Sequence, residues 1–271
     1  MPNDIPLGKK VQYPKQYNPE LLFPISREGN RAKIGVTNHL PFTGVDIWNA
    51  YELSWLNSKG KPEIATAEFI VPCESKNIFE SKSLKLYLNS FNHHVFPSID
   101  VVKQTIQKDL SNVCGQTITV NLYTPESFAT MRLDELDGTC LDHQDIEISD
   151  YEQPNPSYLK TLDHEVEETL HSHLYKSNCE ITQQPDWGSV LIQYSGKQID
   201  HAGLLKYIIS FRHHCEFHEP CAERMFMDIL RQCEPKKLMV YMRYTRRGGI
   251  DINPLRTNFE VIPRNIRLIR Q

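Results

Sequence analysis

Hydrophobic and polar positions along the first half of the chain predict five regular elements. Two stretches have strand-like patterns and are separated by the polar turn "SKGK"; two more repeat apolar residues at helical spacing, and a fifth alternates as a strand. Ser98 precedes the second helical stretch and is a suitable N-cap. The order is strand, strand, helix, helix, strand, over segments 45–57, 62–72, 83–91, 98–110 and 116–123.

The same order recurs about 120 residues later, which indicates an internal repeat. "SLKLYLNSFNHHVF" at 83–96 resembles "GLLKYIISFRHHCEF" at 203–217, so that Tyr87 matches Tyr207. A duplicated module with helices on one face of an antiparallel sheet belongs to the α+β class. We expect an N-terminal extended arm over 1–40, a first module over 41–150 and a second over 151–271, with 151–158 as linker.

Composition excludes several classes of protein. Hydrophobic residues make up 39% and charged residues 24% of the 271 residues, which is typical of a globular chain with a core of its own. The net charge of -4 does not favour nucleic acid as a partner, and no apolar run approaches the ~18 residues of a membrane span. We expect a cytoplasmic location with no membrane partner. Seven cysteines, an odd number with no CxxC pair, predict reduced thiols.

Cys179 in "NCEITQQPDWG" (178–188) is open to three interpretations: an inert thiol, a metal ligand or a nucleophile. A nucleophilic thiol needs a neighbour to handle its proton, and Asp186 follows seven residues later. Pro185 before it and "WG" after it predict a fixed turn around this aspartate. The spacing alone favours a structural thiol, because isolated Cys and Asp pairs are frequent.

Three other polar groups could bind a ligand. His218-Glu219 opens a predicted helix, where a solvated cap is the simpler interpretation. Glu80-Ser81-Lys82 flanks another helix and offers a carboxylate and an ammonium group. "YTRRGGIDINP" (244–254) is a cationic turn able to hold phosphate, or simply a basic surface hairpin. Because these groups are divided between the repeats, one common site requires residues from both halves.

A metal centre is a weaker hypothesis. Cys215 and His218 have a spacing that zinc accepts, and Cys179 could be a third ligand. The sequence holds no HExxH, and "PCAER" lacks the second cysteine of a deaminase signature. No GxGxxG follows a strand, so a nicotinamide cofactor would need a cradle other than the Rossmann fold.

Taken together, "ESKSLKLY" (80–87), "NCEITQQPDWG", "SFRHHCEFHE" (210–219) and "YTRRGGIDINP" resemble the NADPH-dependent 7-cyano-7-deazaguanine reductases of queuosine biosynthesis, in their longer two-module form. The resemblance runs from residue 40 to the end. It implies the tunnelling fold, with tandem antiparallel ββααββ modules, and a homodimer acting on a deazapurine nitrile. It implies no metal. Two NADPH would reduce the nitrile to an aminomethyl group.

The resemblance also implies a role for each motif residue. Cys179 would form a covalent thioimide with the nitrile, with Asp186 as general acid and His218 assisting at the substrate. The other implied roles are substrate binding by Phe79, Glu80, Ser81, His218 and Glu219, and NADPH binding by Ser81, Lys82, Arg247 and Gly248.

Two alternatives stay open on the residues. One is a zinc-dependent cyclohydrolase-type enzyme of the same fold, based on Cys179, Cys215 and His218. The other is a non-enzymatic RNA-binding module, based on the RRGG turn and on the excess of Lys and Arg beyond residue 236.

Overall fold

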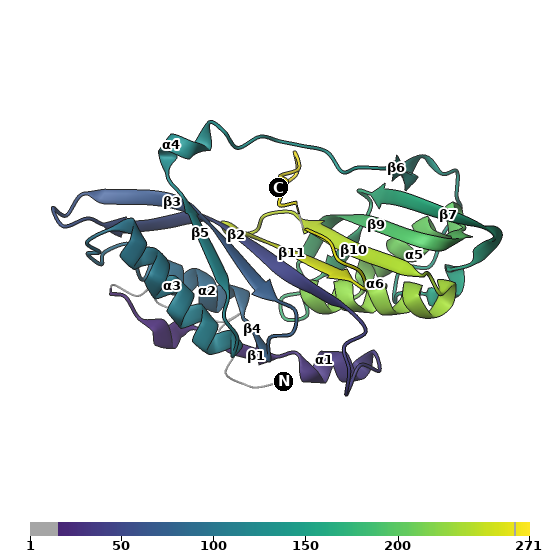
Figure 1. Cartoon of the computed structure of the whole chain (residues 1–271), viewed down its shortest axis with the longest axis horizontal. Helices are drawn as coiled ribbons and strands as arrows, with labels where there is room; N and C mark the ends of the chain where they lie inside the picture. The colour runs from purple at the N-terminus through teal and green to yellow at the C-terminus, as the bar shows by residue number, and fades with distance from the viewer. Residues whose placement is uncertain (1–15, 263) are drawn as a thin grey trace. The chain divides into compact units, whose positions relative to one another are not determined.

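The structure is a computed structural model that describes residues 16–262 and 264–271. The chain forms two compact units, each made of several segments (Figure 1). Unit 1 comprises residues up to 29, 46–132 and 246–252; unit 2 comprises 30–45, 133–245 and 253–271. Strands β2 (Thr43–Leu56) and β11 (Ile250–Thr257) contribute residues to both units.

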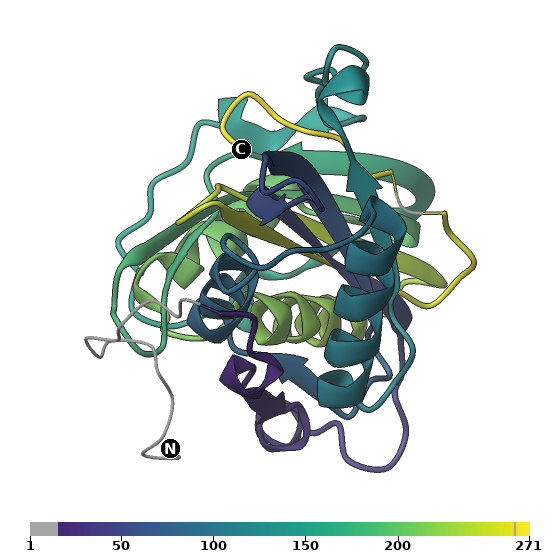
Figure 2. The same cartoon turned by 90° about the vertical axis from the view of Figure 1, so that its left-hand side faces the viewer.

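Unit 1 is a sheet covered on one side by helices. Its strands are ordered β5-β3-β2, followed by the first residues of β11. Helices α2 and α3 lie on the same side of these strands (Figure 2), and aromatic residues such as Trp48 and Phe69 fill the core. The remaining elements are β3 (Pro62–Pro72), β4 (Asn77–Phe79), α2 (Ser81–Asn89), α3 (Ile99–Cys114), β5 (Thr119–Tyr123) and α4 (Pro125–Phe128).

Unit 2 repeats this arrangement with a longer sheet, ordered β11-β10-β9-β7-β6, with β8 also paired to β9. Helices α5 and α6 cover one side of the sheet (Figure 1). The elements are β6 (Thr139–Cys140), η2 (Leu141–His143), η3 (Pro156–Tyr158), β7 (Thr161–Ser172), β8 (Lys176–Asn178), β9 (Pro185–Ile199), α5 (His201–Ser210), η4 (Phe211–His213), α6 (His218–Cys233) and β10 (Lys237–Tyr244).

The α+β class and the repeat are confirmed. Both units follow the order strand, strand, helix, helix, strand. Unit 2 continues into β11 and completes the ββααββ pattern, whereas in unit 1 strand β5 leads into α4. Ser98 caps α3 as predicted, since its Oγ accepts a hydrogen bond from the Val101 N–H at 3.4 Å.

Equivalent hydrogen bonds hold the helix pair in each unit. In unit 1 the Tyr87 hydroxyl of α2 donates to Asp109 of α3 at 2.7 Å, and in unit 2 the Tyr207 hydroxyl of α5 donates to Asp228 of α6 at 2.8 Å. Because each tyrosine is fully buried, burial raises its pKa and the neutral hydroxyl is the donor. The repeat therefore extends to the polar contacts inside the helix layer.

Two segments predicted to be irregular contain short elements at equivalent places. The expected arm contains η1 (Pro19–Leu21), β1 (Pro24–Ser26) and α1 (Glu28–Lys33), and the expected linker contains η3. Asn18 donates its N–H to the Oγ of Ser90, the C-cap of α2, and Asn155 donates its N–H to the Oγ of Ser210, the last residue of α5. These segments are therefore built into the modules; the part of the arm before residue 16 lies outside the described residues, and the boundaries at 41 and 151 stay predictions.

Strand β10 is buried on both faces, which the strand period explains. Leu238, Val240 and Met242 point to one face of the sheet, and Tyr241 and Arg243 point to the other. Segment 264–271 covers this second face, since the Tyr241 hydroxyl donates to the Arg264 carbonyl and Arg243 donates to the Gln271 side chain.

No helix in the described part of the chain is both long and apolar enough for a membrane crossing.

Candidate functional site

Cys179 and Asp186 lie on the same face of one hairpin. Strands β8 and β9 are antiparallel, with Ser177 opposite Asp186 and Asn178 opposite Pro185. The last hydrogen bond before the turn of the hairpin involves Cys179, whose N–H donates to the Gln184 carbonyl at 2.9 Å. Because opposite residues and residues two apart share a face, Cys179 and Asp186 are diagonal neighbours there. The hairpin thus explains the seven-residue spacing between thiol and carboxylate.

The turn predicted around Asp186 is wrong. Pro185, Asp186, Trp187 and Gly188 begin the long strand β9. The tight turn lies earlier, where Gln183 has a φ of 55° and donates its N–H to the Cys179 carbonyl. Proline is tolerated at the first residue of a strand, which is why it occurs in this position.

His218 is brought to Asp186 by the segment before α6. Cys215 bridges to Asn178, and the Glu216 N–H donates to the Asn178 carbonyl at 3.2 Å, so the start of α6 lies beside the hairpin. As the first residue of α6, His218 places its Nε2 3.5 Å from Asp186 Oδ2. Cys179 and Asp186 are both buried, and this arrangement can hold and pass a proton away from bulk water.

Tyr244 supports this group from β10, and the sequence analysis did not single it out. Its ring lies over the His218 ring, with centroids 3.9 Å apart. It also packs against the start of β9: a Cβ at Gly188 would lie 3.4 Å from Tyr244 Cδ1 and 3.2 Å from the Arg243 carbonyl. Burial raises the pKa of Tyr244 well above its usual range, so the hydroxyl stays neutral.

Two further charged residues, Glu219 and Lys176, lie near the hairpin. Glu219, in the first turn of α6, is buried, and the helix dipole favours a carboxylate there. Lys176 donates to Asn178 Oδ1 at 2.7 Å and to the Arg212 carbonyl at 2.6 Å. Partial burial, followed by repulsion from Arg212, lowers the pKa of Lys176, while the charge of Asp186 acts in the opposite direction.

The motif residues of unit 1 form a second group, at the start of α2. Glu80 is the N-cap, and its two carboxylate oxygens accept the N–H groups of Lys82 and Ser83, each at 2.8 Å. Phe79 is buried and packs against Trp48, with ring centroids 4.6 Å apart. Oε1 also accepts from the Ser81 hydroxyl at 3.4 Å. Glu80 therefore has a structural task as a cap, and its Oε2, which accepts from Ser83, keeps a further lone pair for a ligand.

The glycine turn between β10 and β11 lies against α2. Gly248 has a φ of 61°, which favours glycine, and a Cβ there would lie 3.1 Å from Lys85 Nζ. Lys82 lies one helical turn before Lys85, and Arg246 and Arg247 precede the glycine. The predicted cationic turn is confirmed as a tight connection between two strands. Lys85 also lies beside this turn, although the sequence analysis did not name it as a candidate. The only sequence signal for Lys85 is its position shortly after the "ESKS" motif.

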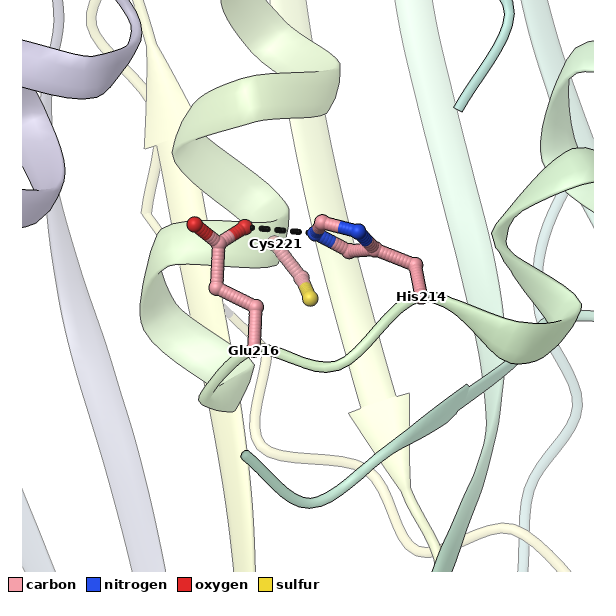
Figure 3. Close-up of side chains that lie close together, drawn as sticks. All are labelled: His214, Glu216 and Cys221. Carbon is pink, nitrogen blue, oxygen red and sulfur yellow. Dashed lines mark hydrogen bonds and ion pairs between the residues drawn. The ribbon is translucent and has the colours of Figure 1, made fainter. Parts of the chain in front are cut away.

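The cluster nearest to a metal site in the described part of the chain differs from the predicted one. His214, Glu216 and Cys221 place their ligand atoms within 4.8 Å of one another (Figure 3). Glu216 accepts hydrogen bonds from His214 at 2.9 Å and from Arg224 Nε and Nη2 at 3.1 Å each. Burial would raise the pKa of Glu216, but His214 and Arg224 together lower it. We interpret the cluster as an ion-pair network, because Arg224 already supplies the compensating cation. The exposed Cys215 lies outside it.

The structure therefore brings the predicted residues together as two groups. Cys179, Asp186, His218 and Glu219 share unit 2, whereas Phe79, Glu80, Ser81 and Lys82 share unit 1 with the glycine turn. The fold and the site therefore define a class of protein: a duplicated α+β enzyme with a buried cysteine and an aspartate on one hairpin, a histidine on the helix beside it, and a basic glycine turn in the other unit.

Comparison with known proteins defines the family. Residues 13–122 match the model "Nitrile reductase, 7-cyano-7-deazaguanine-reductase N-term", and residues 185–261 match that of "QueF-like protein". The "NADPH-dependent 7-cyano-7-deazaguanine reductase" of Burkholderia lata is 58% identical over 273 residues, covering 100% of this chain and 99% of the relative. That of Paraburkholderia xenovorans is 56% identical, with the same coverage. The chain belongs to the family of NADPH-dependent 7-cyano-7-deazaguanine reductases.

Among solved structures, the archaeosine synthase QueF-Like in its apo form matches with a TM-score of 0.31 and 18% identity, over 36% of this chain and 96% of that chain.

Proposed function

We propose that this chain is an oxidoreductase that reduces the nitrile of 7-cyano-7-deazaguanine to an aminomethyl group, with two NADPH and a covalent intermediate on Cys179. Membership of the reductase family supports the reaction, and the relatives are named for this substrate and cofactor. The observation that carries the roles of the residues is the hairpin that puts Cys179 and Asp186 on one face, with His218 3.5 Å from Asp186.

The thiol solves a chemical problem, because a nitrile is a poor hydride acceptor. The Cys179 sulfur adds to the nitrile carbon, and its proton goes to the nitrile nitrogen by way of Asp186, which gives a thioimide. This C=N group accepts a hydride at carbon more readily. The reduced adduct then expels the Cys179 thiolate and becomes an imine, which takes a second hydride and a proton to give the amine. Asp186 and His218 relay the protons of these steps.

Carboxylates bind the purine-like edge of the substrate. Glu80 and Glu219 are both buried, and a buried carboxylate favours a ligand that offers several N–H donors. Phe79 and Ser81 adjoin Glu80 along the chain and line the same place, and His218 contacts the substrate beside Cys179. Of these proposed substrate ligands, Phe79, Glu80 and Ser81 belong to unit 1, and His218 and Glu219 belong to unit 2.

The glycine turn suits the phosphates of NADPH. Ser81, Lys82, Arg247 and Gly248 hold the cofactor, with Lys85 beside them. The absence of a side chain at Gly248 lets a phosphate approach the backbone, and the neighbouring cations favour the charge. When bound, NADPH supplies the hydride for each reduction. We further propose that two copies of the chain form a homodimer, the commonest symmetric assembly.

An intact-mass measurement tests this proposal. Protein mixed with 7-cyano-7-deazaguanine, without NADPH, should gain the mass of one substrate per chain. Cys179→Ala should show no gain, whereas Cys215→Ala, which removes an exposed thiol, should gain mass like the unaltered protein. Adding NADPH should then discharge the adduct with loss of nicotinamide absorbance. The absence of an adduct in folded protein, or an adduct that persists in Cys179→Ala, would refute the proposal.

A further inference from the structure

Gln271 makes a saturated set of hydrogen bonds beneath the Asp186–His218 pair. Its Oε1 accepts from Arg243 Nε and from the Leu268 N–H, each at 3.1 Å. Its Nε2 donates to the Tyr244 carbonyl at 3.0 Å and to Asn253 Oδ1 at 2.9 Å. The side-chain amide therefore uses two acceptor and two donor positions at once, in a place that is only 6% exposed.

The orientation of this amide is fixed by its neighbours. Arg243 and the Leu268 N–H can only donate, and the Tyr244 carbonyl can only accept. The oxygen must face Arg243 and the nitrogen must face Tyr244. A carboxylate of the same shape would keep the contacts with Arg243 but would set an oxygen against the Tyr244 carbonyl.

Tyr244 is held at both backbone groups by this contact. Its carbonyl accepts from Gln271, and its N–H donates at 3.2 Å to Asn253 Oδ1, the atom that also accepts from Gln271. Along β10 the Tyr244 side chain shares a face with Met242, opposite to Arg243. Gln271 thus holds the backbone of β10 at Tyr244 by hydrogen bonds, while the Tyr244 side chain points to the face opposite to Arg243.

The ring of Tyr244 contacts the group formed by Asp186 and His218, so a fixed Tyr244 also restrains this group. It packs against His218, with centroids 3.9 Å apart, and lies close to Gly188, two residues beyond Asp186. We propose that Gln271 is a positioning residue for the reaction: by fixing Tyr244, it sets the orientation of the His218 imidazole relative to Asp186. The expected effect on kcat rests on the proposed function, whereas the expected effect on the orientation of His218 does not.

Gln271→Glu separates positioning from simple tethering of segment 264–271. If Gln271 only tethers the segment through Arg243, a glutamate should preserve or strengthen that contact and leave activity unchanged. If it positions Tyr244, the repelled carbonyl should shift the ring. We expect kcat to fall about tenfold or more, with KM for the nitrile changed less than about threefold, because small misplacements of a catalytic group mainly affect turnover.

Arg264→Ala is the matched control. Arg264 lies in the same segment and forms ion pairs with Asp134 and Asp137 at 2.8 and 3.1 Å, on the surface. Its loss should leave kcat within about twofold of the unaltered protein, because exposed ion pairs contribute little. A Gln271→Glu enzyme that matches Arg264→Ala in kcat overturns the proposal.

A readout without turnover keeps the inference separate from the proposed function. The His218 imidazole lies against the Tyr244 ring at an interplanar angle of 48°, so the ring current of the tyrosine displaces its proton NMR resonances. The His218 signals are assigned by their loss in His218→Gln. They should move in Gln271→Glu and stay in place in Arg264→Ala, whether or not the unaltered protein reduces the nitrile. Unmoved His218 resonances in Gln271→Glu overturn the inference. If Gln271→Glu does not fold, Gln271→Met, which removes all four hydrogen bonds at similar volume, takes its place in both measurements.

Discussion

Two buried carboxylates at the same end of unit 2 differ in their partners, and this difference indicates different tasks. Glu216 accepts from the guanidinium of Arg224 as well as from His214, and its pKa is lowered. It is therefore held in the ionised form. Asp186 lies 3.5 Å from His218, whose imidazole can both donate and accept a proton. A carboxylate beside such a group is suited to exchange protons, whereas Glu216 is suited to hold the segment before α6.

Asp186→Asn should impair turnover more than substrate binding. An amide keeps the shape of the side chain but cannot deliver a proton to the nitrile nitrogen. Losing a general acid costs about 10²–10⁴-fold in rate, so we expect kcat in steady-state NADPH oxidation to fall by about that factor, with a much smaller change in substrate affinity measured by calorimetry. Glu180→Gln, next to Cys179 on the same hairpin, is the control and should remain active. Unchanged turnover in Asp186→Asn would remove its acid role.

At the scale of elements, the hydrophobic pattern was sufficient for five strands and helices of the first module, and the internal repeat extended their order to the second. These five elements bury one face more than the other, which leaves a periodic signal in the sequence. The short elements η1 and η3 left no such signal, because contacts from Ser90 and Ser210 far along the chain fix them. Cys179 and Asp186 could be named from their motif, but their shared face depends on the β8–β9 register. Nothing in the local sequence connects Gln271 with Tyr244, since that contact crosses the sheet.

Removing the tyrosine hydroxyl should cost more stability in unit 2 than in unit 1. Tyr207→Phe leaves Asp228 without the side-chain hydrogen bond that the structure shows for it, whereas after Tyr87→Phe the Tyr17 hydroxyl still donates to Asp109 at 2.6 Å. An unsatisfied buried acceptor costs about 1–3 kcal/mol, and the half-buried Asp228 should fall toward the lower end of this range. We expect a loss of that order for Tyr207→Phe in urea unfolding at pH 7, and a smaller one for Tyr87→Phe.

The effect of Tyr207→Phe should depend on pH. Burial raises the pKa of Asp228 in the folded protein, and the hydroxyl of Tyr207 opposes this rise by stabilising the ionised form. Without the hydroxyl, the folded-state pKa rises further. The stability difference is therefore fully present above both folded-state values and shrinks as the pH falls through them, because a protonated carboxyl needs less stabilisation. Equal losses for the two variants, or a loss for Tyr207→Phe that does not diminish toward acidic pH, would contradict this account.

At the scale of the whole molecule, duplication has allowed the two modules to diverge. Asp200 caps α5 in unit 2 at the position where Glu80 caps α2 in unit 1, so the cap was kept while the longer carboxylate was not. The Cys179 hairpin belongs to unit 2 and the glycine turn to unit 1. Each module thus carries a different part of the proposed set of site residues.

Mixing two inactive variants identifies which chains supply one working site. Cys179→Ala removes the proposed nucleophile in unit 2, and Glu80→Ala removes a proposed substrate ligand in unit 1, so each variant alone should be inactive. If each site of the proposed homodimer draws its two groups from different subunits, heterodimers regain one site with both groups intact. After random exchange, activity should return to about a quarter of the unaltered level. If one chain supplies both groups, the mixture stays inactive. Cys179→Ala mixed with Asp186→Asn, both in unit 2, is the control and should regain no activity in either case.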